Sequence, residues 1–201
     1  NLEKYQARLT VSKSMVKLGV LISGGGTNLQ AIIDACQSGD LDAEVAVVIS
    51  NVAEAYGLER ARQAGIDHLH LTDDEEILKA LLDHEVDLVI LAGYLKLITE
   101  PLLEAYPDCI LNIHPSLIPS FSGKDYYGLK VHQAAVDRGV KVSGVTVHRV
   151  NENFDEGEIL AQETVPVLEG DTAEDLQQRV LEVEHKIYVD TIKKVIQDLG
   201  E

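Results

Sequence analysis

Asn112 and His114 lie at the end of a short apolar run, Cys109 to Ile113, that is typical of a buried β-strand. Pro115 follows and ends the strand, because proline has no backbone N–H group to donate. Side chains two positions apart on a strand point to the same side, so this amide and this imidazole are expected to be neighbours. An amide can donate to an oxyanion, and an imidazole can act as acid or base. The pair indicates a reaction site; the alternative is a core strand with polar residues at its end.

A second candidate site is the glycine-rich turn Ser23-Gly24-Gly25-Gly26-Thr27-Asn28. It follows an expected strand at residues 17–22 and precedes a helix, and this order of elements directs free backbone N–H groups toward an anion. Leu29 stands where a dinucleotide-binding motif needs its third glycine, and no acid that would bind a ribose ends the next strand. A single phosphate group fits this turn better than a dinucleotide. The alternative is a tight turn that holds no ligand.

The elements that must position these residues alternate as in an α/β fold. Strands are expected at residues 17–22, 44–49, 68–71, 87–92, 109–113, 142–150 and 158–167. Helices are expected after the glycine turn, at 56–64, from 73–76 onward, at 129–138, and from 171–172 to the end of the chain. We predict a single-domain, Rossmann-like α/β sheet, mostly parallel with a C-terminal antiparallel strand pair and with helices on both faces. The most apolar strand, 87–92, is expected to be central.

The composition narrows the range of partners. The 201 residues include 34 acids and 17 bases, which gives a formal net charge of −17. Such a charge repels nucleic acid and anionic lipid, so we expect no nucleic-acid and no membrane partner. Cys36 and Cys109 lack the spacing of a metal site or a disulfide framework, and two free thiols suit a cytoplasmic location. Residues 1–14 are polar and precede Met15; they are interpreted as a natural extension or as a vector-derived remnant.

Three stretches, in this order and spacing, resemble the folate-dependent formyltransferase family. Residues 21–32 resemble the phosphate loop of glycinamide ribonucleotide formyltransferases, and residues 112–117, Asn-Ile-His-Pro-Ser-Leu, resemble the core signature of the wider family. Asp155-Glu156-Gly157 matches the segment that carries the catalytic aspartate of that family. The resemblance extends from Lys17 to the end of the chain, so residues 15–201 are identified as a formyltransferase domain.

This resemblance implies that a formyl group passes from 10-formyltetrahydrofolate, the co-substrate, to the amino group of glycinamide ribonucleotide in purine biosynthesis. Attack of the amine on the formyl carbon creates an oxyanion, which Asn112 and a protonated His114 would stabilise. Asp155 would hold His114 in its cationic form and help to move protons through water. The resemblance implies no metal. The His114–Asp155 pair is expected to titrate as a coupled unit.

The same resemblance assigns the binding residues. The ribonucleotide would be held by the glycine turn and the last helix, through Gly26, Thr27, Asn28 and Glu184. The folate would be held by the segment after strand 87–92 and by the catalytic amide, through Lys96, Leu97, Ile98 and Asn112. His148 and, with less support, His132 are expected near the site as buried supporting residues. Both partners are small molecules, and the chain is expected to be a monomer or a homodimer.

Two departures from the family pattern concern the glutamate tail of the folate. Lys96 stands where many relatives carry Arg, and a lysine cannot make the two parallel hydrogen bonds that arginine makes to a carboxylate. Residues 73–76 are all acidic where relatives place an Arg. The long loop 120–128 is aromatic, and loops of this length are often functional. We hypothesise that Lys124, in this loop, supplies part of the missing positive charge.

Four alternatives stay open. A formyl-folate hydrolase would use water in place of the amine, although such relatives usually carry an N-terminal regulatory domain, for which residues 1–14 are too short. A methionyl-tRNA formyltransferase normally has a further C-terminal domain, and the net charge disfavours tRNA. A metal hydrolase would use His114, His148 and Asp155. A nucleotide-binding module would keep the glycine turn without turnover. His68 and His70 are expected to be surface residues.

Overall fold

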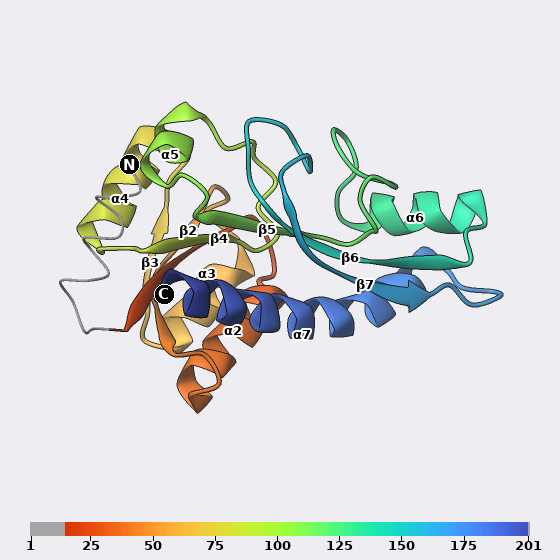
Figure 1. The fold of residues 1–201 in the computed structure, drawn as a ribbon, viewed down its shortest axis with the longest axis horizontal. Coiled ribbons are helices and arrows are strands. Elements are labelled where there is room, and N and C mark those ends of the chain that lie inside the picture. The colour runs from red at the N-terminus through yellow and green to blue at the C-terminus, as the bar shows by residue number, and fades with distance from the viewer. Residues whose placement is uncertain (1–14, 201) are drawn as a thin grey trace.

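Seven strands form one sheet in the order β3-β2-β1-β4-β5-β6-β7 in the computed structural model, which describes residues 15–200 (Figure 1). The strands are β1 (Val16–Ile22), β2 (Ala43–Ser50), β3 (Asp67–His70), β4 (Leu88–Leu91), β5 (Ile110–His114), β6 (Val142–Arg149) and β7 (Ile159–Pro166). Strands β1 to β5 pair in parallel, whereas β6 is antiparallel to both β5 and β7. The predicted fold class is confirmed, and the antiparallel part of the sheet includes the contact of β5 with β6 as well as the expected pair.

The apolar strands form the centre of this sheet. All four residues of β4 are buried, and β4 lies between β1 and β5, as expected from its sequence. Strands that are buried on both faces show continuous apolar runs, because helices cover both sides of a parallel sheet. By contrast, all four residues of β3 at the sheet edge are exposed, and they include His68 and His70. These two histidines are therefore surface residues, as predicted.

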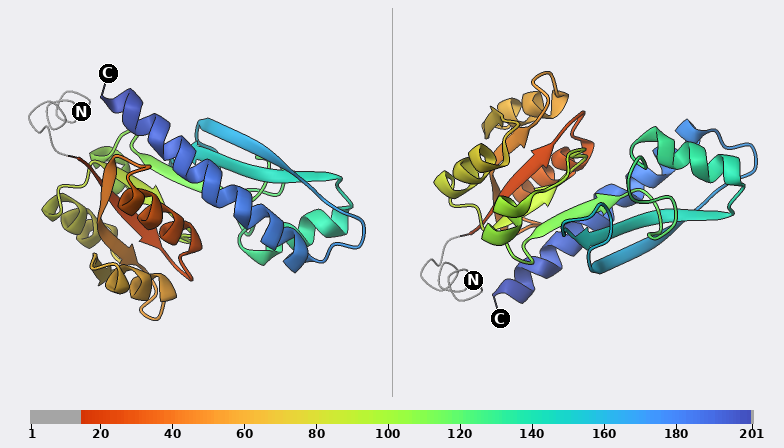
Figure 2. Two further views of the ribbon diagram at one scale, coloured as in Figure 1. Left: turned by 90° about the horizontal axis from the view of Figure 1, so that it is seen from below. Right: turned by 90° about the horizontal axis from the view of Figure 1, so that it is seen from above.

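Helices cover both faces of the sheet. They are α2 (Thr27–Ser38), α3 (Tyr56–Gln63), α4 (Asp74–Asp83), α5 (Glu100–Ala105), α6 (Leu129–Arg138) and α7 (Ala173–Leu199). Helices α2, α3 and α7 lie on one face, while α4 and α5 lie on the other (Figure 1). The long helix α7 crosses the sheet diagonally, packs on β6, β7 and α2, and has α6 beside its first turns (Figure 2). Among residues 15–200, no helix is long and apolar enough to span a membrane.

Local sequence signals set the helix ends. Thr172 starts α7 with a capping box: its hydroxyl accepts from the Asp175 N–H at 3.1 Å, and the Asp175 carboxylate accepts from the Thr172 N–H at 3.0 Å. Asp73 caps α4 by accepting from the backbone N–H groups of Glu75 and Glu76. Acidic residues in the first turn of α4 also suit the positive end of the helix dipole.

The order of the strands reverses between β1 and β4. From β1 the chain proceeds outward to β2 and β3, and from β4 it proceeds in the opposite direction to β5, β6 and β7. In open α/β sheets a crevice forms at such a switch point, outside the carboxyl ends of the strands. The glycine turn leaves β1 there, residues 92–98 leave β4, and β5 ends there at His114. The topology thus places the predicted motifs at one edge.

Candidate active site

A cavity of about 650 Å³ lies at this edge. It is bounded by the glycine turn, the segment after β4, the end of β5, the loop 120–128, the β6–β7 turn and one side of α7. Its lining includes seven predicted site residues: Gly26, Thr27, Asn28, Asn112, His114, Asp155 and Glu184. Residues that are distant in the sequence therefore share a single cavity.

Asp155 lies where the catalytic residues converge. Its Oδ2 atom is 3.4 Å from Nδ1 of His114, and its Oδ1 atom is 3.5 Å from Nε2 of His148. The Gly123 N–H donates to Oδ2 at 3.0 Å. The side chain is only 8% exposed, and the φ angle of 57° is one that Asp tolerates better than most residues. The Gly123 backbone N–H thus fixes the carboxylate in the cavity wall, and two imidazole rings lie against it.

Two opposing effects set the pKa of the Asp155 carboxyl. Burial raises this pKa, because a carboxylate is poorly solvated inside a protein, but His148, His114 and the Gly123 N–H together lower it below its ordinary value. Asp155 is therefore ionised at neutral pH. Burial also lowers the pKa of His114, while the Asp155 carboxylate and the Phe121 carbonyl act in the opposite direction without fully compensating. Asp155 does favour the cationic form of His114, but burial has the larger effect on this pKa.

The hydrogen bonds of His114 indicate where a proton would bind. Its Nε2 is 2.8 Å from the carbonyl oxygen of Phe121, which can only accept, so Nε2 carries a hydrogen. In the neutral ring Nδ1 then has no hydrogen and faces the Asp155 carboxylate. Protonation at Nδ1 would convert this contact into an ion pair. An imidazolium at this position would have an acceptor for each of its two N–H groups.

His148 orients Asn112. The antiparallel register of β5 and β6 places these two residues directly opposite each other. Nδ1 of His148 is 2.8 Å from the Arg149 carbonyl and must donate to it, so Nε2 of the neutral ring is free to accept. The Asn112 amide nitrogen is 3.3 Å from that Nε2. One amide hydrogen is used in this contact, and the second remains for a ligand in the cavity.

His132 also lines the cavity and is buried, as expected. Within residues 15–200 its Nδ1 atom has no hydrogen-bond partner, and burial lowers the pKa of His132 to about 4. This imidazole is therefore neutral at physiological pH. No group of three or more His, Cys, Asp or Glu side chains in this part of the chain is arranged to hold a metal ion. The metal-hydrolase alternative thus finds no support in the arrangement of His114, His148 and Asp155.

The glycine turn leaves the N-terminus of α2 open toward the cavity. Gly26 precedes the helix with φ of 74°, and no side chain from the described part of the chain caps the first N–H groups of α2. A Cβ atom on Gly26 would lie 2.8 Å from the Cα atom of Gly57. On the outer side, Arg60 donates through Nε to the Gly25 carbonyl at 2.7 Å. The turn is held rigidly, and its free N–H groups can bind a phosphate.

We expect Gly26→Ala to weaken ribonucleotide binding at least tenfold and to lower the free energy of unfolding by about 2 kcal/mol. The alanine meets both an unfavourable φ angle and a steric clash with Gly57. Gly39→Ala is the matched control, because Gly39 follows the other end of α2 with φ of 83° and has open space where a Cβ atom would lie. Equilibrium titration and urea denaturation measure both quantities. Equal ribonucleotide affinity in the two variants would contradict the role of the turn.

Glu184 lies deep in the cavity, on α7. It is 6% exposed, and its Oε1 atom accepts from the Asn28 amide at 3.2 Å. Burial raises the pKa of Glu184 to about 7, and the Asn28 hydrogen bond only partly opposes this. The Oδ1 atom of Asn28 has no partner within residues 15–200. These polar atoms are available to a hydroxyl-rich ligand.

Because the pKa of Glu184 is raised in the folded state, the protonated form stabilises the protein. This stability is complete below pH 4.5 and is lost as the pH rises through about 7. The loss between pH 5 and pH 8 amounts to about 3 kcal/mol at most. We therefore expect Glu184→Gln to unfold with a smaller decrease in stability over this range than the wild type. Urea denaturation at pH 5 and pH 8 tests this, and identical pH profiles for both proteins would contradict it.

The segment predicted to bind the folate, residues 96–98, lies outside the cavity lining, unlike the other predicted site residues. Gly93, Tyr94 and Leu95 line the cavity, but Lys96, Leu97 and Ile98 do not. The Lys96 ammonium donates to the carbonyl of Thr72, and Ile98 is buried in the core. A role of these three residues in folate binding stays a prediction.

A hydroxyl group joins the folate segment to the glycine turn. The Leu95 N–H donates to the Ser23 hydroxyl at 2.9 Å, and this hydroxyl donates to the Asn51 side chain at 2.6 Å. At the far end of the segment, the Thr99 N–H donates to Asp74 at 2.9 Å. The segment 95–99 is thus held at both ends.

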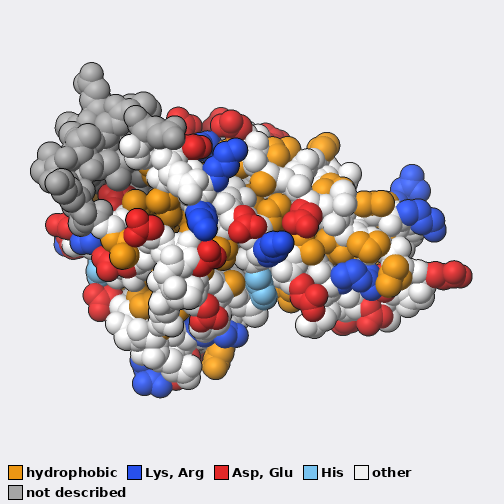
Figure 3. All heavy atoms as spheres, turned by 60° about the horizontal axis from the view of Figure 1, so that its bottom comes forward, with side chains coloured by type: hydrophobic (Ala, Val, Ile, Leu, Met, Phe, Trp, Pro, Cys, Tyr) orange, Lys and Arg blue, Asp and Glu red, His pale blue; other side chains and the backbone are white. Residues whose placement is uncertain are grey.

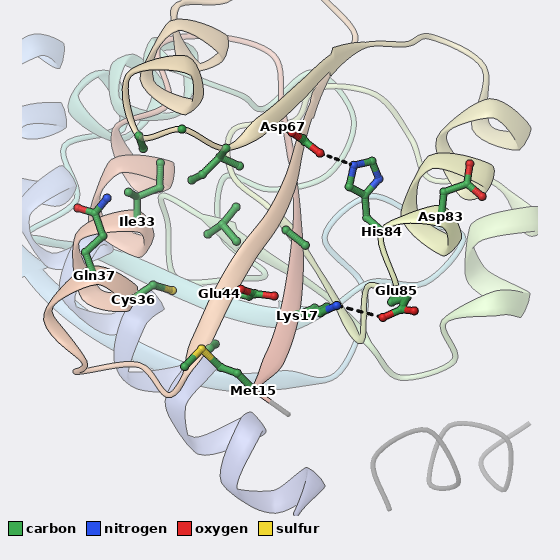
Figure 4. Close-up of a pocket in the computed structure, with 16 residues that line it drawn as sticks. Met15, Lys17, Ile33, Cys36, Gln37, Glu44, Asp67, Asp83, His84 and Glu85 are labelled. Carbon is green, nitrogen blue, oxygen red and sulfur yellow. Dashed lines mark hydrogen bonds and ion pairs between the residues drawn. The ribbon is translucent and has the colours of Figure 1, made fainter. Parts of the chain in front are cut away.

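A second hollow, of about 610 Å³, lies at the opposite edge of the sheet (Figure 4). Two pairs of its polar side chains contact each other: the Lys17 ammonium is 3.0 Å from Glu85, and Nε2 of His84 is 3.1 Å from Asp67. Cys36 lies in its wall, and burial raises the pKa of this thiol to about 11, which disfavours the reactive thiolate at neutral pH. Within residues 15–200, none of the predicted site residues lines this hollow.

The protein surface carries charges of both signs. On the face that α7 covers, acidic and basic side chains are interspersed with hydrophobic ones, and the described residues form no continuous basic patch there (Figure 3). The excess of acids in the composition is therefore not gathered into one patch on this face. Among the described features, the open helix N-terminus in the cavity is the one that we predicted to bind an anion.

The cavity combines an amide, an imidazole and a carboxylate with an open phosphate-binding turn, and the chain belongs to the formyl transferase family. The sequence profile of this family matches residues 16–192. A phosphoribosylglycinamide formyltransferase from Haemophilus influenzae is 46% identical over 188 residues, which cover 89% of this chain and 86% of that protein. The solved structure of glycinamide ribonucleotide transformylase 1 from Symbiobacterium toebii superposes with a TM-score of 0.84 at 51% identity, covering 90% of this chain and 88% of the other.

A plant relative is longer. The chloroplastic phosphoribosylglycinamide formyltransferase of Vigna unguiculata is 43% identical over 98% of this chain, and the chain spans 66% of the length of that protein. The family predicted from residues 21–32, 112–117 and 155–157 is confirmed.

Sequence reasoning missed several parts of the site. It did not predict the Asn28–Glu184 contact or the hydrogen bond from the Gly123 N–H to Asp155. It also did not predict that Gln177 and Leu181 on α7 line the cavity. The helical spacing of Gln177, Leu181 and Glu184 was the available signal, because residues three or four apart share one face of a helix.

Proposed function

We propose that this protein transfers a formyl group from 10-formyltetrahydrofolate to the amino group of glycinamide ribonucleotide, a step of purine biosynthesis. The observation that carries the proposal is the convergence of Asn112, His114 and Asp155 in one cavity with the open N-terminus of α2. A site for binding alone needs no ionised carboxylate held between two imidazoles. The relatives named above carry the same activity in their names, which supports the proposal.

The ribonucleotide binds at the glycine turn. Its phosphate accepts from the free N–H groups at the start of α2 and from Thr27, and its ribose hydroxyls meet Glu184 and Asn28. The ionised form of Glu184 accepts hydrogen bonds from hydroxyl groups, so ribose binding favours deprotonation of this carboxyl. The amino group of the substrate then extends toward Asn112 and His114.

The reaction begins when the amine attacks the formyl carbon. The carbonyl π electrons move to oxygen, and the oxyanion accepts from the free Asn112 N–H and lies beside protonated His114. The bond from carbon to the folate nitrogen then breaks, and the C=O bond forms again. The amine loses one proton and the folate nitrogen gains one. Asp155 accepts the proton that the amine loses and returns it, through water, to the folate nitrogen, so no net proton is consumed.

Water must be kept from competing with the amine, since attack by water would make the protein a formyl-folate hydrolase. The decisive assay follows folate product spectrophotometrically from a 10-formyl folate analogue, with and without the ribonucleotide. Product that forms only with the ribonucleotide is the expected result. Equal product in both reactions would assign the hydrolase reaction, and absence of product in both, with ligands still bound, would leave a binding module.

The cellular context and assembly follow from the same proposal. A cytoplasmic location fits the two free cysteines, Cys36 and Cys109. The predicted catalytic residues line one cavity within a single chain, which supports a monomer as the reacting unit. A homodimer is the alternative assembly, and sedimentation measures which one forms.

A further inference from the structure

The cavity offers little positive charge to two anionic substrates. Among the described residues that line it, Lys124 is the only Lys or Arg, whereas Asp125, Asp155 and Glu184 are acids. Under the proposed function, on which this inference rests, the ribonucleotide brings a phosphate and the folate brings the carboxylates of its glutamate. Like charges in a low-dielectric cleft repel strongly, so at least one of these anions needs a cation.

The other cations near the cavity already have partners. Lys96 donates to the Thr72 carbonyl and lies outside the lining. Arg60 donates to the Gly25 carbonyl and stacks on Tyr56, with its guanidinium carbon 4.9 Å from the ring centre. Lys130 lies 4.5 Å from the centre of the Tyr127 ring and donates to its hydroxyl at 3.1 Å. None of these three cations is free to follow a ligand into the cavity.

Lys124 is free to do so. It is exposed, and its ammonium group has no partner within residues 15–200. Its backbone position is nevertheless fixed, because the preceding Gly123 N–H donates to Asp155 and the Phe121 carbonyl accepts from His114. The ring of Phe121 also contacts that of Tyr126 at 6.4 Å between centres. An unpaired cation is thus attached to a loop that is anchored on His114 and Asp155.

We propose that Lys124 binds an anionic group of a bound substrate. The glutamate carboxylate of the folate and the phosphate of the ribonucleotide are the two possible sources of this anion. The phosphate already has the free N–H groups of α2, whereas no other Lys or Arg in the described lining serves the carboxylate. The geometry therefore favours the carboxylate. Lys124 takes the part that the family resemblance assigned to position 96.

The test compares Lys124→Ala, Lys124→Arg and the matched control Lys130→Ala in steady-state kinetics with both substrates. Lys124→Ala is expected to raise the KM of the formyl folate about tenfold and to leave kcat within about twofold. Lys124→Arg restores the affinity, because it keeps the charge, and Lys130→Ala changes neither constant. With a 10-formyl pteroate analogue, which lacks the glutamate, the wild type and Lys124→Ala should give the same KM.

A KM that rises for the ribonucleotide instead would assign the anion as the phosphate, and the anion-binding role would stand. Unchanged KM values for both substrates, or a loss confined to kcat, would overturn the proposal. Failure of the proposed function is recognised separately: the wild type would then give no product. In that event calorimetric binding of the folate analogue and of inorganic phosphate to wild type and Lys124→Ala still decides the role of Lys124.

Discussion

Asp155→Asn is expected to lower kcat by about 10²- to 10⁴-fold, with little change in either KM. The wild-type carboxylate is ionised, accepts the Gly123 N–H and faces Nδ1 of His114. An amide of the same shape keeps the packing but cannot accept a proton from the attacking amine. It also removes the negative charge that favours protonated His114. Formyl-transfer assays at saturating substrate, with affinities from titration, measure the effect.

Asp125→Asn is the matched control for this variant. Asp125 lines the same cavity and also has a positive φ angle, 71°, but lies in the exposed loop 120–128. It should retain activity within about threefold of the wild type, since a solvated charge that touches no reacting group contributes little. A kcat of Asp155→Asn within tenfold of the wild type would remove Asp155 from the proton transfer. Unequal unfolding free energies of the two variants would show damage to the fold instead.

Asn112→Ala is expected to lower kcat by about 10²- to 10³-fold, the usual effect of deleting one oxyanion donor. The alanine removes both the N–H available to the oxyanion and the contact with Nε2 of His148. The KM values should change much less than kcat, because the negative charge on the formyl oxygen develops only in the transition state. The same assay, with both substrates varied, separates these constants.

Asn153→Ala controls for the loss of an amide at this end of the sheet. Asn153 is exposed in the β6–β7 turn and does not line the cavity. We expect wild-type constants for it. His148→Gln provides a second comparison, since its amide can still bond to Asn112, and it should lose less activity than Asn112→Ala. A greater loss in His148→Gln would mean that His148 contributes through its contact with Asp155 as well as through Asn112.

The sequence was sufficient for those parts of the fold that depend on local chemistry. Helix α6 spans the residues predicted for it, and β4 is central because its apolar run suits burial on both faces. The shared direction of Asn112 and His114 follows from strand alternation alone, and both line the cavity. Helix α5 was not delimited, because it is only six residues long and has Pro101 in its first turn.

The parts of the fold and of the site that the sequence did not predict depend on contacts that no local sequence pattern specifies. Asn28 and Glu184 are 156 positions apart, and the burial that raises the pKa of Glu184 exists only once α7 packs against α2. The direction of residues 96–98 could not be predicted either, because it is set by the Thr72 and Asp74 contacts on α4 and its preceding loop. Family resemblance indicated the functional positions, and tertiary packing decides which of them face the cavity.

The hydroxyl group of Ser23 has a consequence for engineering this protein. It satisfies the Leu95 N–H and the Asn51 side chain at the same time, and so connects the segment proposed to bind the folate to the turn proposed to bind the phosphate. The two sites are therefore not independent modules. A redesign of residues 93–98 for another cofactor must keep the Leu95 N–H in its present register, or the geometry of the phosphate turn changes with it. Under the proposed function, a mutation at one end of the cavity is therefore expected to alter substrate binding at the other end as well.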